Sequence, residues 1–313
     1  MAIVHSRTRV ALVGAIAVSF GLTACGSDSL GGSSSSSSST TSASVSADTK
    51  LADMVPAAIK SKGTLTIGTD ASYAPNEFLA ADGKTVQGLD IDLTKAVLAK
   101  LGLKANFQNA SFGTIQNGVQ SGKYDMGVSS FTINKTRLQQ VTMVSYFSAG
   151  TQWATKKGNP PQRAVGEDKV DVNNPCGLTV GVQKDTVQVD DLTARSKKCT
   201  DEGKPGITQV VEQDQSKVTA DLVSGKVKAM AADSPVTLYA VKTTNGAVET
   251  VGDIYDSAPY GLVLKKDQTD FGKALVEGLK AIKADGSYDT ILKNWNNSSG
   301  ATSSFEVNPS VAS

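Results

Sequence analysis

Histidine is nearly absent from this sequence. His5 is the only one among 313 residues, and it lies in an N-terminal stretch that we expect to be removed. Ser-His-Asp and Cys-His catalysis need a histidine in the folded domain, and so do metal sites with histidine ligands. The mature chain is therefore predicted to contain none of these sites, and we expect neither a metal nor a cofactor.

Cysteine is scarce as well. Downstream of Cys25 only Cys176 and Cys199 remain, without the C-x-x-C spacing of redox motifs. Two cysteines alone cannot complete a structural zinc site. In an oxidising compartment such a pair predicts a disulfide. Closing a loop of this size would stabilise the fold by about 3 kcal/mol in the chain-entropy description.

The sequence has no excess of positive charge and no basic stripe. It holds 31 Lys and Arg against 30 Asp and Glu. Loss of Arg7 and Arg9 would leave 29 basic residues against 30 acidic ones, a formal charge of −1. Proteins that bind nucleic acid carry a clustered positive surface, so we expect no nucleic-acid partner.

The N-terminal residues predict the compartment. Arg7 and Arg9 precede the apolar run Val10–Leu22, which is shorter than the roughly 20 residues of a membrane span but typical of a signal peptide. The run ends in Leu22-Thr-Ala-Cys25, which resembles the lipobox of bacterial lipoproteins. The resemblance implies a signal peptide over residues 1–24 and a lipid on Cys25 that anchors the protein to the outer face of the cell membrane. An ordinary signal peptide followed by a chance cysteine is the alternative.

Residues 25–49 have the composition of a tether. They include seven consecutive serines, Ser33–Ser39, with further Gly, Thr and Ala. Such a stretch buries too little apolar surface to offset the entropy of ordering it. We expect it to link the lipid flexibly to a folded domain.

From Lys50 onward short β-like runs alternate with amphipathic helical ones. Strands are predicted at 64–69, 105–107 and 124–129. The helix between the first two has Leu93, Val97 and Leu101 on one face, and Asp90 is expected to be its N-cap. Asp92 is likewise assigned to the helix start rather than to a catalytic pair. A helix with Ile115 and Val119 on one face separates the second and third strands. This order predicts an α/β fold with a largely parallel sheet.

A second block of the same type follows, with strands at 178–182, 208–211 and 227–232 and helices at 187–196, 216–223 and 236–243. Extended segments at 146–157 and 260–264 are expected to connect the blocks, and two helices around Gly286 close the chain. We therefore predict lobe 1 over 50–150, lobe 2 over 151–259, and completion of lobe 1 with a C-terminal tail over 260–313. Two lobes joined by two strands form a cleft that closes by hinge motion.

Several phrases resemble the bacterial extracellular solute-binding proteins of family 3, from about Lys62 to Trp295. They are Gly68-Thr-Asp-Ala-Ser-Tyr-Ala-Pro-Asn-Glu-Phe78, Gly88-Leu-Asp-Ile-Asp-Leu93, Ser121-Gly-Lys-Tyr-Asp125, Ser129-Ser-Phe-Thr-Ile-Asn-Lys-Thr-Arg137, Ala231-Ala-Asp-Ser-Pro235 and Gly286-Ser-Tyr288. The resemblance implies the two-lobed type II periplasmic-binding-protein fold. It also implies that the protein binds a polar amino acid and delivers it to the permease of an ABC importer.

The family motif implies where the charged groups of an amino acid would lie. Arg137 offers a planar fork for the carboxylate, with hydroxyl donors from Thr132 and Ser130. Asp233 would receive the ammonium group. Other interpretations stay open: Arg137 as a surface residue on a short helix, Asp233 as a helix cap, and Ser129 as a strand-end serine.

The remaining site residues follow from the same resemblance. Tyr73 and Phe112 match aromatic wall positions, although either is also a plausible core residue. Asp70 matches a contact to polar side-chain groups in glutamine-binding relatives, or a turn. Gln183 and Thr186 would face the ligand from lobe 2, unless Thr186 is a helix N-cap. Two departures, Pro75-Asn76 in place of Pro-Phe and Lys184-Asp-Thr-Val187 without glycine, leave side-chain specificity open; we favour a glutamine- or glutamate-like ligand.

Other functions are compatible with the same pattern. A few relatives of the fold are dehydratases, which would need a tuned general acid in the cleft. A lipoprotein that senses the ligand and signals to a membrane receptor would need the same closing cleft as an importer component. We expect a binding protein that is monomeric and is not an enzyme.

Overall fold

The computed structural model describes residues 47–159 and 170–311. The predicted signal peptide, Cys25 and nearly all of the 25–49 tether lie outside the described residues. The first helix, α1 (Thr49–Asp53), begins after Asp48, whose carboxylate accepts backbone N–H groups of its first turn. A second short helix, α2 (Ala57–Lys60), leads into the sheet.

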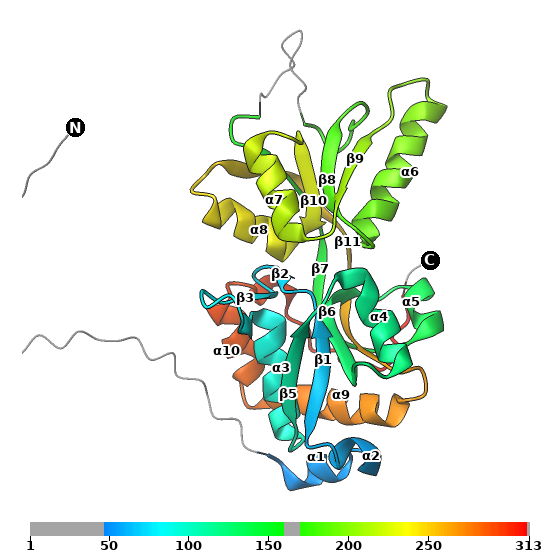
Figure 1. The fold of residues 1–313 in the computed structure, drawn as a ribbon, viewed down its shortest axis with the longest axis vertical. Helices are drawn as coiled ribbons and strands as arrows, with labels where there is room; N and C mark the ends of the chain where they lie inside the picture. The colour runs from blue at the N-terminus through cyan, green and yellow to red at the C-terminus, as the bar shows by residue number, and fades with distance from the viewer. Residues whose placement is uncertain (1–46, 160–169, 312–313) are drawn as a thin grey trace, which may run out of the picture. The chain divides into compact units, whose positions relative to one another are not determined.

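One eight-stranded sheet runs through the molecule. Its strands, in spatial order, are β5 (Lys104–Asn109), β1 (Thr64–Thr69), β6 (Met126–Thr132), β11 (Val248–Leu264), β7 (Thr142–Lys156), β10 (Ala229–Asp233), β8 (Thr179–Gln183) and β9 (Thr208–Glu212). The pairs β5–β1, β1–β6, β10–β8 and β8–β9 are parallel, whereas β7 and β11 are antiparallel to each other and to their neighbours. Figure 1 shows β7 and β11 running between two bodies.

Helices cover both bodies. They are α3 (Leu89–Lys100), α4 (Phe112–Ser121), α5 (Lys135–Gln140), α6 (Val187–Asp201), α7 (Gln215–Ser224), α8 (Ser234–Thr243), α9 (Thr269–Ala284), α10 (Ser287–Asn294) and the 3-10 turn η1 (Ser298–Gly300). A small antiparallel sheet of β2 (Ser72–Tyr73), β3 (Glu77–Leu79) and β4 (Val86–Gln87) lies apart from the main one. Below, lobe 1 means β1–β6 with α3, α4, α5, α9 and α10, and lobe 2 means β8–β10 with α6, α7 and α8. In the part of the chain that the structure describes, no helix is both long and apolar enough to cross a bilayer.

The strand that returns from lobe 2 to lobe 1 is longer than its sequence suggests. Only residues 260–264 are predicted to be extended, yet β11 begins at Val248 and pairs with β7 over most of its length. Its register shifts between Val251 and Tyr255, between Tyr255 and Ala258, and between Tyr260 and Gly261. These irregularities and its exposed polar residues remove the apolar alternation by which a strand is recognised.

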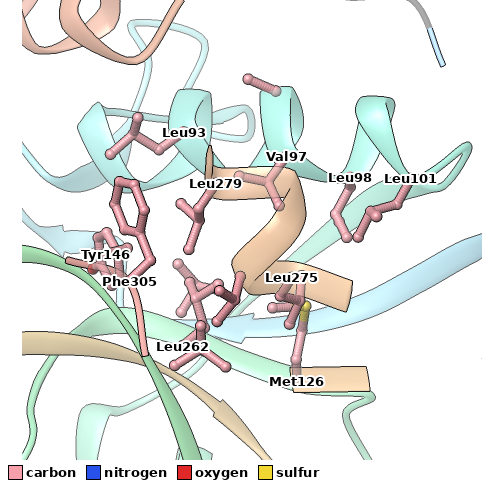
Figure 2. Close-up of a cluster of buried hydrophobic side chains, with 14 of the residues drawn as sticks. Leu93, Val97, Leu98, Leu101, Met126, Tyr146, Leu262, Leu275, Leu279 and Phe305 are labelled. Carbon is pink, nitrogen blue, oxygen red and sulfur yellow. The ribbon is translucent and has the colours of Figure 1, made fainter. Parts of the chain in front are cut away.

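The core of lobe 1 packs α3 against α9. Leu93, Val97 and Leu101 share a face, as predicted, and pack with Leu275 and Leu279 of α9 in one buried cluster (Figure 2). Burying a leucine fully contributes about 1.5–3 kcal/mol relative to leaving it exposed. The cluster fixes the direction of α3 and with it the position of the helix N-terminus next to the cleft.

The predicted capping role of Asp90 is wrong. Gly88 is the N-cap of α3, and Asp90 is a fully buried residue of its first turn. The Leu89 and Asp90 N–H groups donate instead to the carbonyls of Pro75 and Asn76, both at 3.0 Å, so no capping side chain is required. Gly88 has φ 139°, and a Cβ there would lie 2.1 Å from the Asn76 carbonyl oxygen. The first turn of α3 thus holds the 75–77 segment tightly.

Lobe 2 has smaller apolar clusters and a covalent link. Cys176 and Cys199 form the predicted disulfide, which ties the segment before β8 to the end of α6 over a separation of 23 residues. The Leu178, Val180 and Leu192 side chains belong to a buried apolar cluster of this lobe. The strands and helices predicted between 178 and 243 are all confirmed, with ends that differ by a few residues.

Candidate ligand-binding site

A pocket lies where the carboxyl ends of parallel strands from the two lobes face each other, the usual place for a ligand in α/β folds. It is lined by Asp70, Tyr73, Phe112, Ser129, Ser130, Thr132, Arg137, Gln183, Thr186, Val187, Gln188 and Asp233. All nine residues predicted to contact a ligand are among them. The cavity has a volume of about 280 Å³, and hydrogen bonds from Arg137 to Asp185 and from Gln183 to Asp70 link the two lobes beside it. The cleft is therefore closed, and a ligand can enter only when the lobes separate.

Arg137 lies on α5 and is half-buried against the rings of Phe112 and Phe131. Its guanidinium carbon is 5.4 Å from the ring centroids of both Phe112 and Phe131. One guanidinium nitrogen donates to the Thr132 carbonyl (2.7 Å) and another to the Asp185 carbonyl of lobe 2 (3.3 Å). Burial lowers the arginine pKa to about 10, so the group stays charged at neutral pH.

Asp233 ends β10 on the lobe 2 side of the pocket. Its carboxylate accepts the Gln188 side-chain amide (2.8 Å) and the Tyr260 hydroxyl (2.6 Å). It is the N-cap residue of α8, but its side chain makes no capping hydrogen bond. Burial raises the pKa of this carboxyl group. The carboxylate is thus held at the pocket wall, facing the lobe that carries Arg137.

Asp70 follows β1 and serves both the turn and the cleft. Its carboxylate accepts the backbone N–H groups of Ser72 (3.1 Å) and Phe112 (2.9 Å). It also accepts the Gln183 side-chain amide from lobe 2 at 2.9 Å. Burial raises its pKa. The Asp70–Gln183 hydrogen bond therefore joins the two lobes across the closed cleft.

Tyr73 joins the lobes by a different contact. Its ring packs on Ala232 and Val236 of lobe 2, and its hydroxyl accepts the backbone N–H of Asp233 at 3.3 Å. Nearby, a Cβ placed on Gly113 of α4 would lie 1.9 Å from a carboxylate oxygen of Asp185 in lobe 2. A larger residue at this position would therefore require the Asp185 side chain to move.

The hydroxyl group of Ser130, which is predicted as a carboxylate donor, and that of its neighbour Ser129 are both engaged within lobe 1. The Ser130 hydroxyl donates to Asp90 (3.0 Å), and that of Ser129 to Glu77 (3.0 Å). A serine hydroxyl has a single proton, so in this conformation neither proton is directed to a ligand. Thr186 is the N-cap residue of α6, and its hydroxyl donates to the Gln183 carbonyl (2.8 Å).

Phe112 and Thr132 complete the lobe 1 side. The Phe112 ring is stacked on that of Phe131, with centroids 4.5 Å apart, and the pair forms the bed of the Arg137 guanidinium. Thr132 contributes its carbonyl to Arg137, and its side chain lines the pocket.

Some residues of the site carry no signal in the sequence. Gln188 lies in the first turn of α6, where a polar residue is ordinary, and Tyr260 belongs to a predicted crossing strand. Both hold the Asp233 carboxylate. Glu77 and Asp90 do not line the pocket; they lie behind Ser129 and Ser130 and accept hydrogen bonds from their hydroxyl groups. Among the described residues no cluster of three or more His, Cys, Asp or Glu side chains is arranged to hold a metal.

The model of the bacterial extracellular solute-binding proteins, family 3, matches residues 65–298. The chain belongs to this family. It is 33% identical over 293 residues to the arginine-binding protein ArgT of Corynebacterium glutamicum, a match that covers 93% of this chain and 92% of the relative.

Solved structures agree with this assignment. An ancestral arginine-binding protein bound to arginine has a TM-score of 0.66 and 32% identity over 74% of this chain and 98% of its own. An ancestral arginine-binding protein bound to glutamine has a TM-score of 0.66 and 31% identity, and the match covers 75% of this chain and 98% of the other. An ancestral amino-acid-binding protein described as a precursor of cyclohexadienyl dehydratase has a TM-score of 0.63 and 30% identity. That match covers 76% of this chain and 97% of the other.

The family assignment settles the general properties. The fold is the two-lobed type II periplasmic-binding-protein fold, with a mostly parallel central sheet. These relatives are amino-acid-binding proteins rather than enzymes, and the family comprises extracytoplasmic solute-binding components of ABC transporters. The dehydratase alternative is not favoured.

Proposed function

We propose that this protein captures a cationic amino acid, arginine foremost, and presents it to the permease of an ABC importer. The observation that carries the proposal is the charge of the pocket. Two carboxylates, Asp70 and Asp233, face one guanidinium, Arg137. A ligand with one negative and two positive groups balances these charges.

The balance matters because buried charges without partners are costly. The carboxylate of an amino acid pairs with Arg137 and its ammonium with Asp233. A neutral side chain would leave Asp70 without an ionic partner, whereas a guanidinium or ammonium side chain supplies one in place of the Gln183 amide. Phe112 and Tyr73 cover the aliphatic part of the ligand. Two of the relatives described above are arginine-binding proteins, which supports the same choice of ligand.

Glutamine is the second candidate, and a specific contact favours it. Asp70 already accepts an amide N–H from Gln183, and a glutamine ligand can offer the same group. The ancestral neighbour bound to glutamine supports this candidate as well. A glutamate-like ligand, with a second negative group, would stand next to Asp70 and is disfavoured by repulsion.

The remaining parts of the proposal concern the anchor and the partner. We propose that Cys25 is lipidated, that residues 25–49 tether the domain to the outer face of the membrane, and that the protein is monomeric. We propose hinge boundaries near residues 150 and 260. Signalling to a receptor instead of transport would use the same site.

A calorimetric titration of the purified mature protein with arginine, lysine, glutamine and glutamate tests the ligand class. Arginine should bind most tightly, and in a separate thermal-unfolding experiment it should raise the melting temperature increasingly with its concentration. Asp70→Asn should weaken arginine binding by about tenfold or more and leave glutamine binding within about threefold, because only arginine loses an ionic partner. Tighter binding of glutamate than of arginine would refute the proposal.

A further inference from the structure

Two acidic side chains behind the pocket take no part in the proposed binding of the ligand. Glu77 of β3 and Asp90 of α3 are both 0% exposed. Neither carboxylate belongs to an ion pair among the described residues. Acids this deeply buried are rarely left without a cation, so their arrangement requires an explanation.

Asp90 holds an irregular point of the sheet. Strand β6 pairs with β11 at Phe131 and again at Gly127, and the register is interrupted between them. In this gap Ser130 adopts φ 50°, the left-handed region that costs about 1–2 kcal/mol for a non-glycine residue. Both its backbone N–H (2.9 Å) and its hydroxyl (3.0 Å) donate to the same oxygen, Oδ2 of Asp90. The carboxylate thus replaces the ladder bonds that β6 lacks here.

The hydrogen bonds distinguish the two acids. Oδ2 of Asp90 also accepts the Tyr146 hydroxyl at 2.5 Å, so Asp90 has the surroundings of an ionised acceptor. Its other oxygen, Oδ1, is buried and has no donor among the described groups. The Ser130 hydroxyl oxygen lies 3.0 Å from Oδ2 of Asp90 and 3.5 Å from Oε2 of Glu77, so the two carboxyl groups flank the same hydroxyl group. A proton on Glu77 would give this pair of acids the donor that it lacks. Burial and the neighbouring Asp90 raise the pKa of Glu77 well above its ordinary value.

The other titratable groups around the pair do not neutralise it. Asp70, at the end of β1, adds negative charge close to Glu77. Tyr146 of β7 and Tyr73 of β2 are neutral donors or acceptors whose own pKa values burial raises. No lysine or arginine is among the main causes of the raised pKa of either acid. Two full negative charges in contact at such a site would repel strongly, and a single shared charge avoids this.

We propose that Glu77 and Asp90 share one proton and act as positioning residues, holding Ser130 in its left-handed conformation and thereby shaping the lobe 1 wall of the pocket. Ser129 and Ser130 line that wall, and their hydroxyl groups are oriented by Glu77 and Asp90. The effect on ligand affinity rests on the proposed function, whereas the shared proton does not.

Spectroscopy and stability test the proton without any ligand. The infrared spectrum near neutral pH should contain the C=O band of a protonated carboxyl group that Glu77→Gln removes. A carboxyl group with a raised pKa stabilises the fold fully below its ordinary value near 4.5 and loses this contribution as pH rises to the folded-state pKa. Over that range the unfolding constant of the wild type should therefore rise about tenfold per pH unit relative to Glu77→Gln. The surface variant Glu277→Gln should give curves parallel to the wild type.

Binding measurements test the positioning role. Glu77→Gln keeps a donor toward Asp90 and an acceptor for Ser129, so its affinity for arginine at pH 7 should stay within about threefold of the wild type. Glu77→Met has a similar length but neither group, and Asp90→Asn loses the charged acceptor; each should bind about tenfold more weakly or worse. If Asp90→Asn does not fold, the difference in arginine affinity between Glu77→Gln and Glu77→Met tests the positioning role by itself.

The outcomes separate the two proposals. An unchanged infrared band and parallel pH curves in Glu77→Gln would overturn the shared proton, and wild-type affinity in Glu77→Met would overturn the positioning role. Failure of arginine to bind the wild type would refute the proposed ligand. The spectroscopic and pH measurements would still decide on the proton, and positioning would be measured with glutamine.

Discussion

Each lobe buries an aspartate on a helix that packs against its sheet, and the pKa values of the two aspartates are shifted in opposite directions. Asp90 in lobe 1 is 0% exposed, and its pKa is raised by burial. Asp221 on α7 in lobe 2 is 2% exposed, yet its pKa is lowered to about 2 by hydrogen bonds from Lys217 and Lys226. Both lysine side chains are about half exposed, so Asp221 lies directly beneath the surface, whereas Asp90 lies deep. Burial alone therefore does not set the direction of a pKa shift; a cation within reach does.

The lobes also differ in what stabilises them. Lobe 1 has a large apolar cluster built from both ends of the chain, including Leu65 near its start and Phe305 near its end. Lobe 2 is built from one continuous segment, has smaller clusters and contains the disulfide. A smaller core gains more from a covalent link than a larger one.

The largest predicted effects test whether the lobes contribute equally to binding. Arg137→Ala in lobe 1 and Asp233→Ala in lobe 2 should each weaken arginine binding by about 3–5 kcal/mol, two or more orders of magnitude, because each leaves a buried ligand charge unpaired. Calorimetric titration measures both. Lys135→Ala, an exposed neighbour on α5, is the control and should bind normally. A loss confined to one variant would show that one lobe holds the ligand alone.

Removal of the disulfide should have the next largest effect. Replacing Cys176 and Cys199 together by serine should lower the free energy of unfolding by about 3 kcal/mol, since the 23-residue separation is no longer closed in the unfolded chain. Hydrogen exchange should locate the loss of protection in α6, β8 and β9, while α3 and α9 keep theirs. Equal loss in both lobes would contradict the view that the link stabilises lobe 2 specifically.

The smallest effect concerns the lowered pKa of Asp221. Its contribution to stability is present above its ordinary pKa of 3.8 and is lost as pH falls toward about 2. Chemical unfolding at several pH values should therefore show a loss in the wild type that Asp221→Asn lacks, while the exposed Asp267→Asn behaves as the wild type. The opposite slope at Asp221, with stability lost as pH rises, would remove the contrast with lobe 1.

Much of this fold is readable from the sequence, because its elements are long and periodic. The spacing of Leu93, Val97 and Leu101 predicts the buried face of α3, and Gly122 ends α4 in the left-handed conformation. By contrast, β2 and β4 have two residues each and show no periodicity at all. Their position depends on the carbonyls that Pro75 and Asn76 offer to α3, a contact that no local pattern reveals.

Most of the residues that line the pocket can be predicted from the sequence, but the hydrogen bonds among them cannot. All nine expected residues line one pocket, and most of them lie at or next to the end of a strand or helix at the cleft. The direction of a hydroxyl proton depends on groups far away in sequence: Ser130 meets Asp90 across 40 residues, and Ser129 meets Glu77 across 52. Asp90 is misassigned for the same reason, because an acid in a first helical turn is usually stabilised by the helix itself.

The place of β11 in the sheet has a consequence for the order in which the protein forms as it is synthesised and exported. This last strand of the chain lies between β6 and β7, at the junction of the two lobes. Before Val248–Leu264 is available, the sheet consists of two separate halves, each ending in an unpaired strand. The final pairing joins segments more than a hundred residues apart, as in Val263 with Gly127, and such distant contacts form slowly. A nascent chain therefore stays incompletely folded until nearly all of it has been made, the state in which an unfolded polypeptide can still be threaded through a membrane.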